Sequence, residues 1–154
     1  MPSAWRLTKT KHLADAFSGE GARLYGGRWN SPGMRAVYVS ETLALAALEV
    51  LVHLQTVSPL GAYSCIPVDF DPSLVESVDI AGLPPNWSDW PVSADVVAIG
   101  DRWLQEGRSA VLKVPSAVIP TESHFVLNPL HPEFDRISIG PASAFTFDPR
   151  LSKG

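Results

Sequence analysis

Residues 24–54 read LYGGRWNSPGMRAVYVSETLALAALEVLVHL, and the rest of the chain is organised around this stretch. It begins as a turn, because two glycines precede Arg28 and a Ser-Pro-Gly turn signal follows at residues 31–33. Glycine lets the backbone approach a ligand closely, so the turn is expected to present the Arg28 guanidinium. A guanidinium can clamp a phosphate or carboxylate, although a surface arginine paired with an acid is the commoner case.

A short strand at residues 36–39 and the longest apolar helix of the chain complete the stretch. The helix is expected over about residues 41–55, with Ser40 as its N-cap and most of its circumference buried. Glu49 falls on a narrow polar stripe of this helix together with His53. Periodicity alone favours a stripe that faces solvent over a catalytic one.

The composition is that of one soluble domain over residues 1–154, with 45% hydrophobic and 18% charged residues and a net charge of −4. No Lys/Arg stripe could neutralise phosphates, so no direct nucleic-acid partner is expected. No apolar run approaches the roughly 18 residues of a membrane span and no signal peptide is visible, so we expect a cytoplasmic protein without membrane contact. No His/Cys spacing supplies a metal site.

The remaining elements mix strands and helices without regular alternation, which favours a compact α+β fold. Residues 4–7 are expected to form an edge strand, and residues 93–105 a second helix that ends near Gly107. Further strands are expected at residues 61–70, 74–80, 110–114, 137–139 and 144–147, with an extended segment at 115–120.

Tyr38 and Ser116 are further candidates for a site. Tyr38 alternates with valines in its strand and could stack on a ring of a ligand, but a core tyrosine with a satisfied hydroxyl is the simpler interpretation. Ser116 lies in a proline-bounded segment and could present a hydroxyl or a backbone group. No G-x-S-x-G elbow surrounds it, so a hydrolase nucleophile is weakly supported. The residues alone therefore predict an α+β domain with an anion-binding cleft.

A resemblance to a known family goes further. The central stretch, with WRL at residues 5–7, GDRWL at 100–104, HFVLNPLHPEF at 124–134 and a closing FDPRL, resembles the RES-domain family. These are toxins of bacterial toxin–antitoxin pairs whose partner is an Xre-like antitoxin. The family is named for an Arg, a Glu and a Ser, which by motif position fall on Arg28, Glu49 and Ser116. Ser123 is a rival for the last position, but the sequence VPSAVIP favours Ser116.

The resemblance implies a fold similar to that of ADP-ribosyltransferases, with NAD as substrate and no metal. The implied reaction breaks the nicotinamide–ribose bond, with water or inorganic phosphate as acceptor. Tyr38 and Arg6 match further positions that line the family's cleft. Loss of nicotinamide leaves an oxocarbenium-like ribose, which the Glu49 carboxylate could stabilise.

The other matched residues have expected roles in the same reaction. Arg28 and Arg6 could clamp the pyrophosphate, Tyr38 could stack on nicotinamide, and Ser116 could hydrogen-bond near the nicotinamide end. One alternative keeps the fold and transfers ADP-ribose to a protein. Another is a non-catalytic module that only binds its antitoxin. The catalytic interpretation predicts that Arg28, Tyr38, Glu49 and Ser116 line one cleft.

Overall fold

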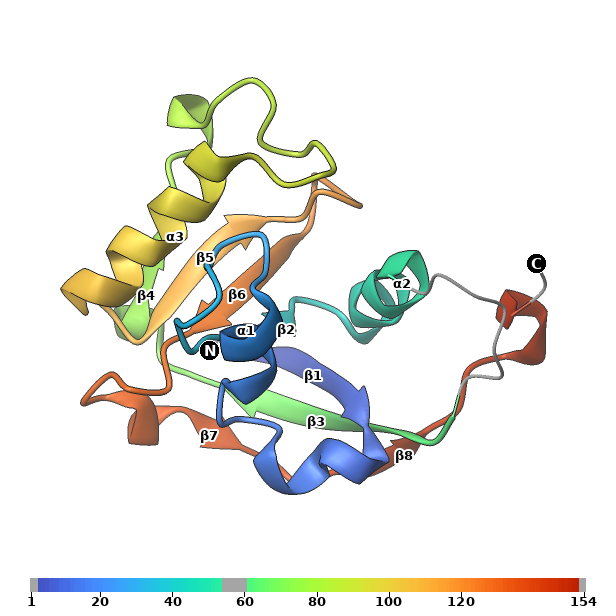
Figure 1. Ribbon diagram of the computed structural model, residues 1–154. Coiled ribbons are helices and arrows are strands. Elements are labelled where there is room, and N and C mark those ends of the chain that lie inside the picture. Colours follow the sequence, from blue (N-terminus) through green and yellow to red (C-terminus); the bar gives the residue numbers. More distant parts are fainter. Residues whose placement is uncertain (1–2, 54–60, 153–154) are drawn as a thin grey trace.

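The computed structural model describes residues 3–53 and 61–152, and the strands of this part of the chain form one eight-stranded mixed sheet (Figure 1). The strands are β1 (Ser3–Lys9), β2 (Val37–Ser40), β3 (Tyr63–Asp69), β4 (Val75–Ser77), β5 (Val111–Pro115), β6 (Ser123–Leu127), β7 (Ser138–Ile139) and β8 (Ser143–Phe145). Their order is β4-β5-β6-β2-β1-β3-β7, and β8 also pairs with β3. Only β4 and β5 pair in parallel among these strands. A mixed sheet with few helices agrees with the predicted α+β class.

The helices of this part are α1 (Glu20–Tyr25), α2 (Leu43–His53) and α3 (Ala94–Glu106), with short 3-10 segments at Thr10–Asp15, Pro72–Leu74, Ile80–Gly82, Phe134–Arg136 and Pro149–Ser152. Helix α3 covers the β4–β5–β6 part of the sheet, and α2 lies against β1 (Figure 1). As expected, Ser93 caps α3 and Gly107 ends it in the left-handed conformation, with φ of 60°.

The expectation that the apolar helix is mostly buried was wrong. Within residues 3–53 and 61–152 the longest helix is α3, and α2 buries only Leu45 and Ala46 fully. Val52 of α2 is 56% exposed despite the apolar sequence of the helix. An apolar sequence does not say which surfaces will cover a helix. The described part of the chain covers only one face of α2. Residues 54 and 55, at the predicted end of the helix, lie outside the described residues.

The sheet has a seam between β1 and β2. These two strands pair at a single position, Trp5 with Ser40, whereas β1 and β3 pair over their whole length. Arg6 follows Trp5 and spans the opening: its Nε donates to the carbonyl of Ala16 at 3.1 Å and its Nη1 to that of Tyr38 at 3.5 Å. Strand β1 is therefore central, and the prediction of an edge strand was wrong because both neighbours come from distant segments.

Within residues 3–53 and 61–152, the buried hydrophobic side chains form three clusters. One lies on the face that carries Val37 and Val39 of β2, and a second lies between the opposite face and α3, around Trp103. The third packs beneath α2 around Leu7 and Phe147. The alternation predicted for β2 is confirmed, since Tyr38 packs with the second cluster and its two valine neighbours with the first.

The second cluster also fixes the loop that follows α1. Trp29 is 2% exposed, and its carbonyl rests directly on Gly100 of α3. A Cβ at Gly100 would lie 1.8 Å from that carbonyl oxygen, so only glycine fits there. The loop with Arg28 is thereby held against a rigid helix.

Candidate functional site around Glu49

Hydrogen bonds between the loop of Arg28 and strand β2 hold this loop in place. The Tyr38 hydroxyl donates to Asn30 Oδ1 at 2.6 Å and accepts from the Trp29 amide at 3.1 Å. A Cβ at Gly27 would lie 2.7 Å from the same hydroxyl, so this glycine makes room for it. Burial raises the pKa of Tyr38, and its phenol therefore stays neutral. Tyr38 positions the turn that carries Arg28.

Arg28 extends from this turn to a second loop. Its Nη1 donates to the carbonyls of Trp87 at 3.0 Å and Asp89 at 2.9 Å. Partial burial lowers the pKa of Arg28, whereas the nearby Glu49 carboxylate raises it, so the two side chains lie within electrostatic reach. Arg28, Tyr38 and Glu49 come from a loop, a strand and a helix, and Arg28 lies within electrostatic reach of the other two.

The carboxylate of Glu49 lies between two histidines. Its Oε1 is 2.9 Å from Nε2 of His124, and its Oε2 is 3.5 Å from Nε2 of His53. Burial alone would raise the pKa of Glu49, but the hydrogen bonds from the two histidines outweigh burial and lower it to about 2. Glu49 is therefore an anion at neutral pH, and its side chain is 25% exposed. The polar stripe of α2 faces β6 as well as solvent.

His124 was not among the residues singled out from the sequence. It begins the HFVL segment of β6, whose strand character was also missed, and pairs across the sheet with Ser40 of β2. Its Nδ1 lies 3.0 Å from the Ser40 hydroxyl oxygen. Ser40 therefore does not cap α2 as expected: the Thr42 hydroxyl accepts from the Leu45 amide at 3.0 Å and caps the helix. Nothing local marks His124, because its partner Glu49 is 75 residues away.

Ser116 lies beside this cluster but points into the protein. It is fully buried, and its hydroxyl oxygen accepts from the amides of Val118 at 3.1 Å and Ile119 at 3.0 Å. The segment expected to be extended at residues 115–120 is therefore a closed turn. The Ser116 amide donates to the carbonyl of Glu122, whose side chain accepts from the Thr42 hydroxyl at 2.9 Å. Ser116 is thus tied to the start of α2 through Glu122.

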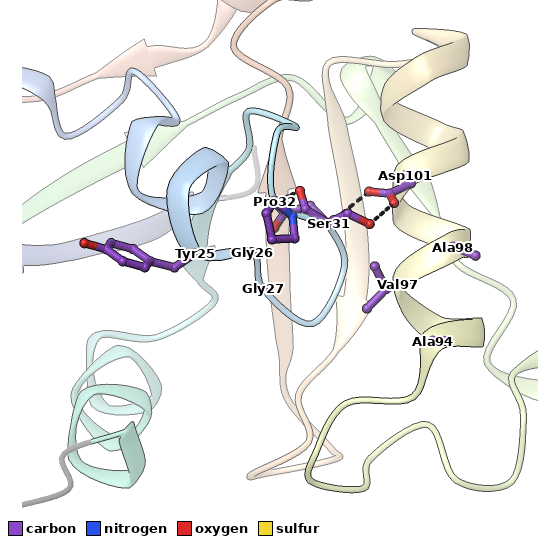
Figure 2. A pocket seen from close by; sticks show the side chains of 10 residues that line it. Tyr25, Gly26, Gly27, Ser31, Pro32, Ala94, Val97, Ala98 and Asp101 are labelled. Atoms are coloured by element: carbon purple, nitrogen blue, oxygen red, sulfur yellow. Dashed lines mark hydrogen bonds between the residues drawn. The ribbon is translucent and has the colours of Figure 1, made fainter.

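A separate open hollow of about 370 Å³ lies between the loop after α1 and helix α3 (Figure 2). Asp101 crosses it to the loop: Oδ1 accepts from the Ser31 amide at 2.8 Å, and the other carboxylate oxygen accepts from the Ser31 hydroxyl. This carboxylate is occupied in holding the loop, and the lining includes neither Arg28 nor Glu49. The hollow is therefore not the site around Glu49.

Within residues 3–53 and 61–152, no three His, Cys, Asp or Glu side chains are grouped as metal ligands would be. Over the same residues, no helix has the length and apolar character that crossing a membrane requires.

The chain is similar to proteins of one known family. Residues 3–148 match the family described as RES domain. A protein named Toxin Res from Yersinia enterocolitica is 38% identical over 149 residues, which is 96% of this chain and 97% of the relative. A protein named Prs ADP-ribosylating toxin from a Sphingobium species is 34% identical over 155 residues, which is 97% of this chain and 96% of the relative. The chain belongs to the RES-domain family.

A solved structure has the same fold. A chain of the Mycobacterium tuberculosis MbcT–MbcA toxin–antitoxin complex superposes with a TM-score of 0.76 at 23% identity, and the match covers 97% of this chain and 86% of that one. The mixed sheet therefore belongs to a fold that a chain of this complex also has.

Proposed function

We propose that this protein is a toxin that breaks the nicotinamide–ribose bond of NAD in the cytoplasm. The observation that carries the proposal is a fixed carboxylate with a partly buried guanidinium within its electrostatic reach. Glu49 stays ionised because His124 and His53 donate to it, and Arg28 lies within electrostatic reach. Such a pair suits a substrate that has an anionic pyrophosphate next to a ribose that becomes cationic.

The roles follow from the charges of the two side chains. As the bond to nicotinamide breaks, positive charge develops on C1 and the ring oxygen of the ribose, and the Glu49 carboxylate lowers the energy of that state. Arg28 neutralises phosphate oxygens through its planar fork of N–H donors. Because both groups are held before substrate arrives, little reorganisation is needed in the reaction.

We assign supporting roles to three further residues. Tyr38 holds the Arg28 turn through Asn30, since its hydroxyl is already bonded on both sides. Arg6 fills the seam and adds positive charge beside it. Ser116 closes the turn before β6 with its fully buried hydroxyl, and its main-chain amide ties this turn to Glu122 at the start of α2, in place of direct contact with nicotinamide.

The acceptor of the ADP-ribose group separates two versions of the proposal. Water or inorganic phosphate would give ADP-ribose or its phosphate ester, and this is the version we favour. The Sphingobium relative is named an ADP-ribosylating toxin, which supports transfer to a protein as the second candidate. Mass spectrometry after incubation with NAD, phosphate and cell lysate distinguishes a free product from a modified protein.

An antitoxin partner is the remaining part of the proposal. The fold is shared with the MbcT–MbcA toxin–antitoxin complex, and we expect an Xre-like antitoxin to bind here and suppress turnover. A cell that makes such a toxin needs an inhibitor that binds the active form, which acts by mass action. A module that only binds its antitoxin would release no nicotinamide in any condition.

The experiment that tests this function measures nicotinamide release from NAD by the purified protein, with and without phosphate. We expect turnover by the wild type, a loss of about 100-fold or more in kcat for Glu49→Gln, and a drop of about 10-fold or more in kcat/KM for Arg28→Gln. Glu133→Gln, which changes an exposed acid after β6, is the matched control and should keep full activity. Full activity in Glu49→Gln would remove the carboxylate from the mechanism.

A further inference from the structure

The two carboxylate oxygens of Glu49 have partners that differ in distance and in exposure to solvent. His124 holds Oε1 at 2.9 Å, and its side chain is only 14% exposed. His53 reaches Oε2 at the longer distance of 3.5 Å, and its side chain is 58% exposed. One oxygen is therefore held from inside the protein, and the other is covered by a side chain that an incoming ligand could displace.

A buried serine fixes the ring of His124 in turn. Ser40 is 5% exposed, and its hydroxyl lies 3.0 Å from Nδ1 of the imidazole. An ionised carboxylate can only accept a hydrogen bond, so Nε2 must bear the proton that faces Glu49. In the neutral ring with that tautomer Nδ1 accepts from the Ser40 hydroxyl, so a serine, a histidine and a glutamate form one hydrogen-bonded row.

The three residues of this row come from two paired strands and one helix. Ser40 and His124 are directly paired residues of the antiparallel strands β2 and β6, and Glu49 comes from the second turn of α2. Thr42 and Glu122, which flank the same strands, bind each other at 2.9 Å and fix the start of α2. The distance from His124 to Glu49 is therefore set by main-chain pairing and by a helix cap.

We propose that His124 is a positioning residue that holds Oε1 of Glu49 and so presents Oε2 to the ribose of the substrate, an inference that rests on the proposed function. The carboxylate has two rotatable bonds between its Cβ and its oxygens, so without His124 it could swing toward Arg28 or His53. Arg28 lies within electrostatic reach of Glu49, and the exposed His53 faces its Oε2. His124 is the group that faces it from β6.

The test replaces the imidazole of His124 by side chains that can or cannot donate a hydrogen bond to Glu49. His124→Phe keeps the volume but has no donor, and His124→Gln supplies an N–H near the position of Nε2. We expect His124→Phe to lower kcat for NAD cleavage by about 30-fold or more, with KM changed less than about threefold, and His124→Gln to recover activity to within about fivefold of the wild type. His12→Gln, which changes an exposed histidine of the Thr10–Asp15 segment, should have no effect.

A second measurement reads the carboxylate itself and does not depend on turnover. In protein labelled with ¹³C at glutamate carboxyls, we expect the titration midpoint of Glu49 to rise by at least about one pH unit in His124→Phe and to fall back in His124→Gln. A purely structural role for His124 would lower the melting temperature without moving this midpoint. If His124→Phe does not fold, Ser40→Ala replaces it, and we expect about a threefold to tenfold loss in kcat with a smaller rise of the midpoint.

The outcomes separate this inference from the proposed function. A wild type that releases no nicotinamide contradicts the function, and the titration of Glu49 then still decides whether His124 holds the carboxylate. An active wild type whose kcat is kept in a folded His124→Phe variant overturns the inference alone. A folded His124→Gln variant as inactive as His124→Phe overturns it as well.

Discussion

The acid sensitivity of the protein should depend on Glu49. Its pKa is about 2 in the folded protein against an ordinary value of 4.5. A carboxyl whose pKa is lowered by folding stabilises the folded state above its ordinary pKa, and this contribution disappears as the pH falls toward the folded value. The contribution is therefore complete at pH 7 and declines between about pH 5 and pH 2.

We expect the wild type to lose about 1.4 kcal/mol of unfolding free energy between pH 7 and pH 3.5 through this one group. The side chain of the Glu49→Gln variant cannot titrate. The unfolding free energy of this variant should therefore fall by about 1.4 kcal/mol less than that of the wild type over the same pH range. Urea denaturation at the two pH values provides the comparison. Parallel pH dependences in the two proteins would mean that the histidines do not hold Glu49 in solution.

At the scale of elements, the contact between α3 and the loop after α1 decides whether the Arg28 turn forms. A methyl group at Gly100 would meet the Trp29 carbonyl, which is main chain and cannot rotate away. We expect Gly100→Ala to reduce the unfolding free energy by more than about 3 kcal/mol, because α3 and the loop must separate. The midpoint of urea denaturation measures this effect.

Gly21 of α1 is the matched control for this substitution. A Cβ at Gly21 meets no atom within 4 Å, and the residue is exposed on a helix. Gly21→Ala should therefore be neutral or stabilise the protein by up to about 1 kcal/mol, as helix propensity predicts. Equal denaturation midpoints for the two alanine variants would mean that α3 and the loop are not in close contact.

Helices and strands with local sequence signals could be predicted, whereas contacts between distant segments could not. Helix α3 was predictable because its cap at Ser93, its stop at Gly107 and its periodicity are local signals. Strand β2 was predictable from alternation, and the motif match named Arg28 and Glu49. The contacts of His124 and Ser116 could not be predicted from the sequence. The partner of His124 is brought close by strand pairing, and the Ser116 hydroxyl is bonded within a turn. The burial of α2 was overestimated because composition does not say what covers a helix.

At the scale of the whole molecule, the elements that build the site also expose apolar side chains. Tyr25 before the Arg28 turn is 84% exposed, Trp90 beside His53 is 72% exposed, and Val52 of α2 is 56% exposed. We expect an inhibitory antitoxin to cover this surface. Val52→Ser should weaken its binding about tenfold, the loss expected from one buried valine side chain.

Leu130 provides the control for that binding experiment. It is 74% exposed and follows the end of β6 opposite to His124. Leu130→Ser should leave antitoxin affinity unchanged, as measured by titration calorimetry with the purified partner. Equal affinities for both variants and the wild type would place the antitoxin elsewhere on the protein.

The single pair that joins β1 to β2 divides the main-chain hydrogen bonds of the molecule into two ladders. One contains β1, β3, β7 and β8, and the other β2, β4, β5 and β6. Separating them breaks few backbone bonds, so amide protons beside the seam should exchange with solvent sooner than those inside either ladder. Arg6 comes from one ladder, and Arg28 is held by Tyr38 of the other. A pyrophosphate bound by both would join the two ladders, so the ligand that the site recognises would also slow the opening of the protein that binds it.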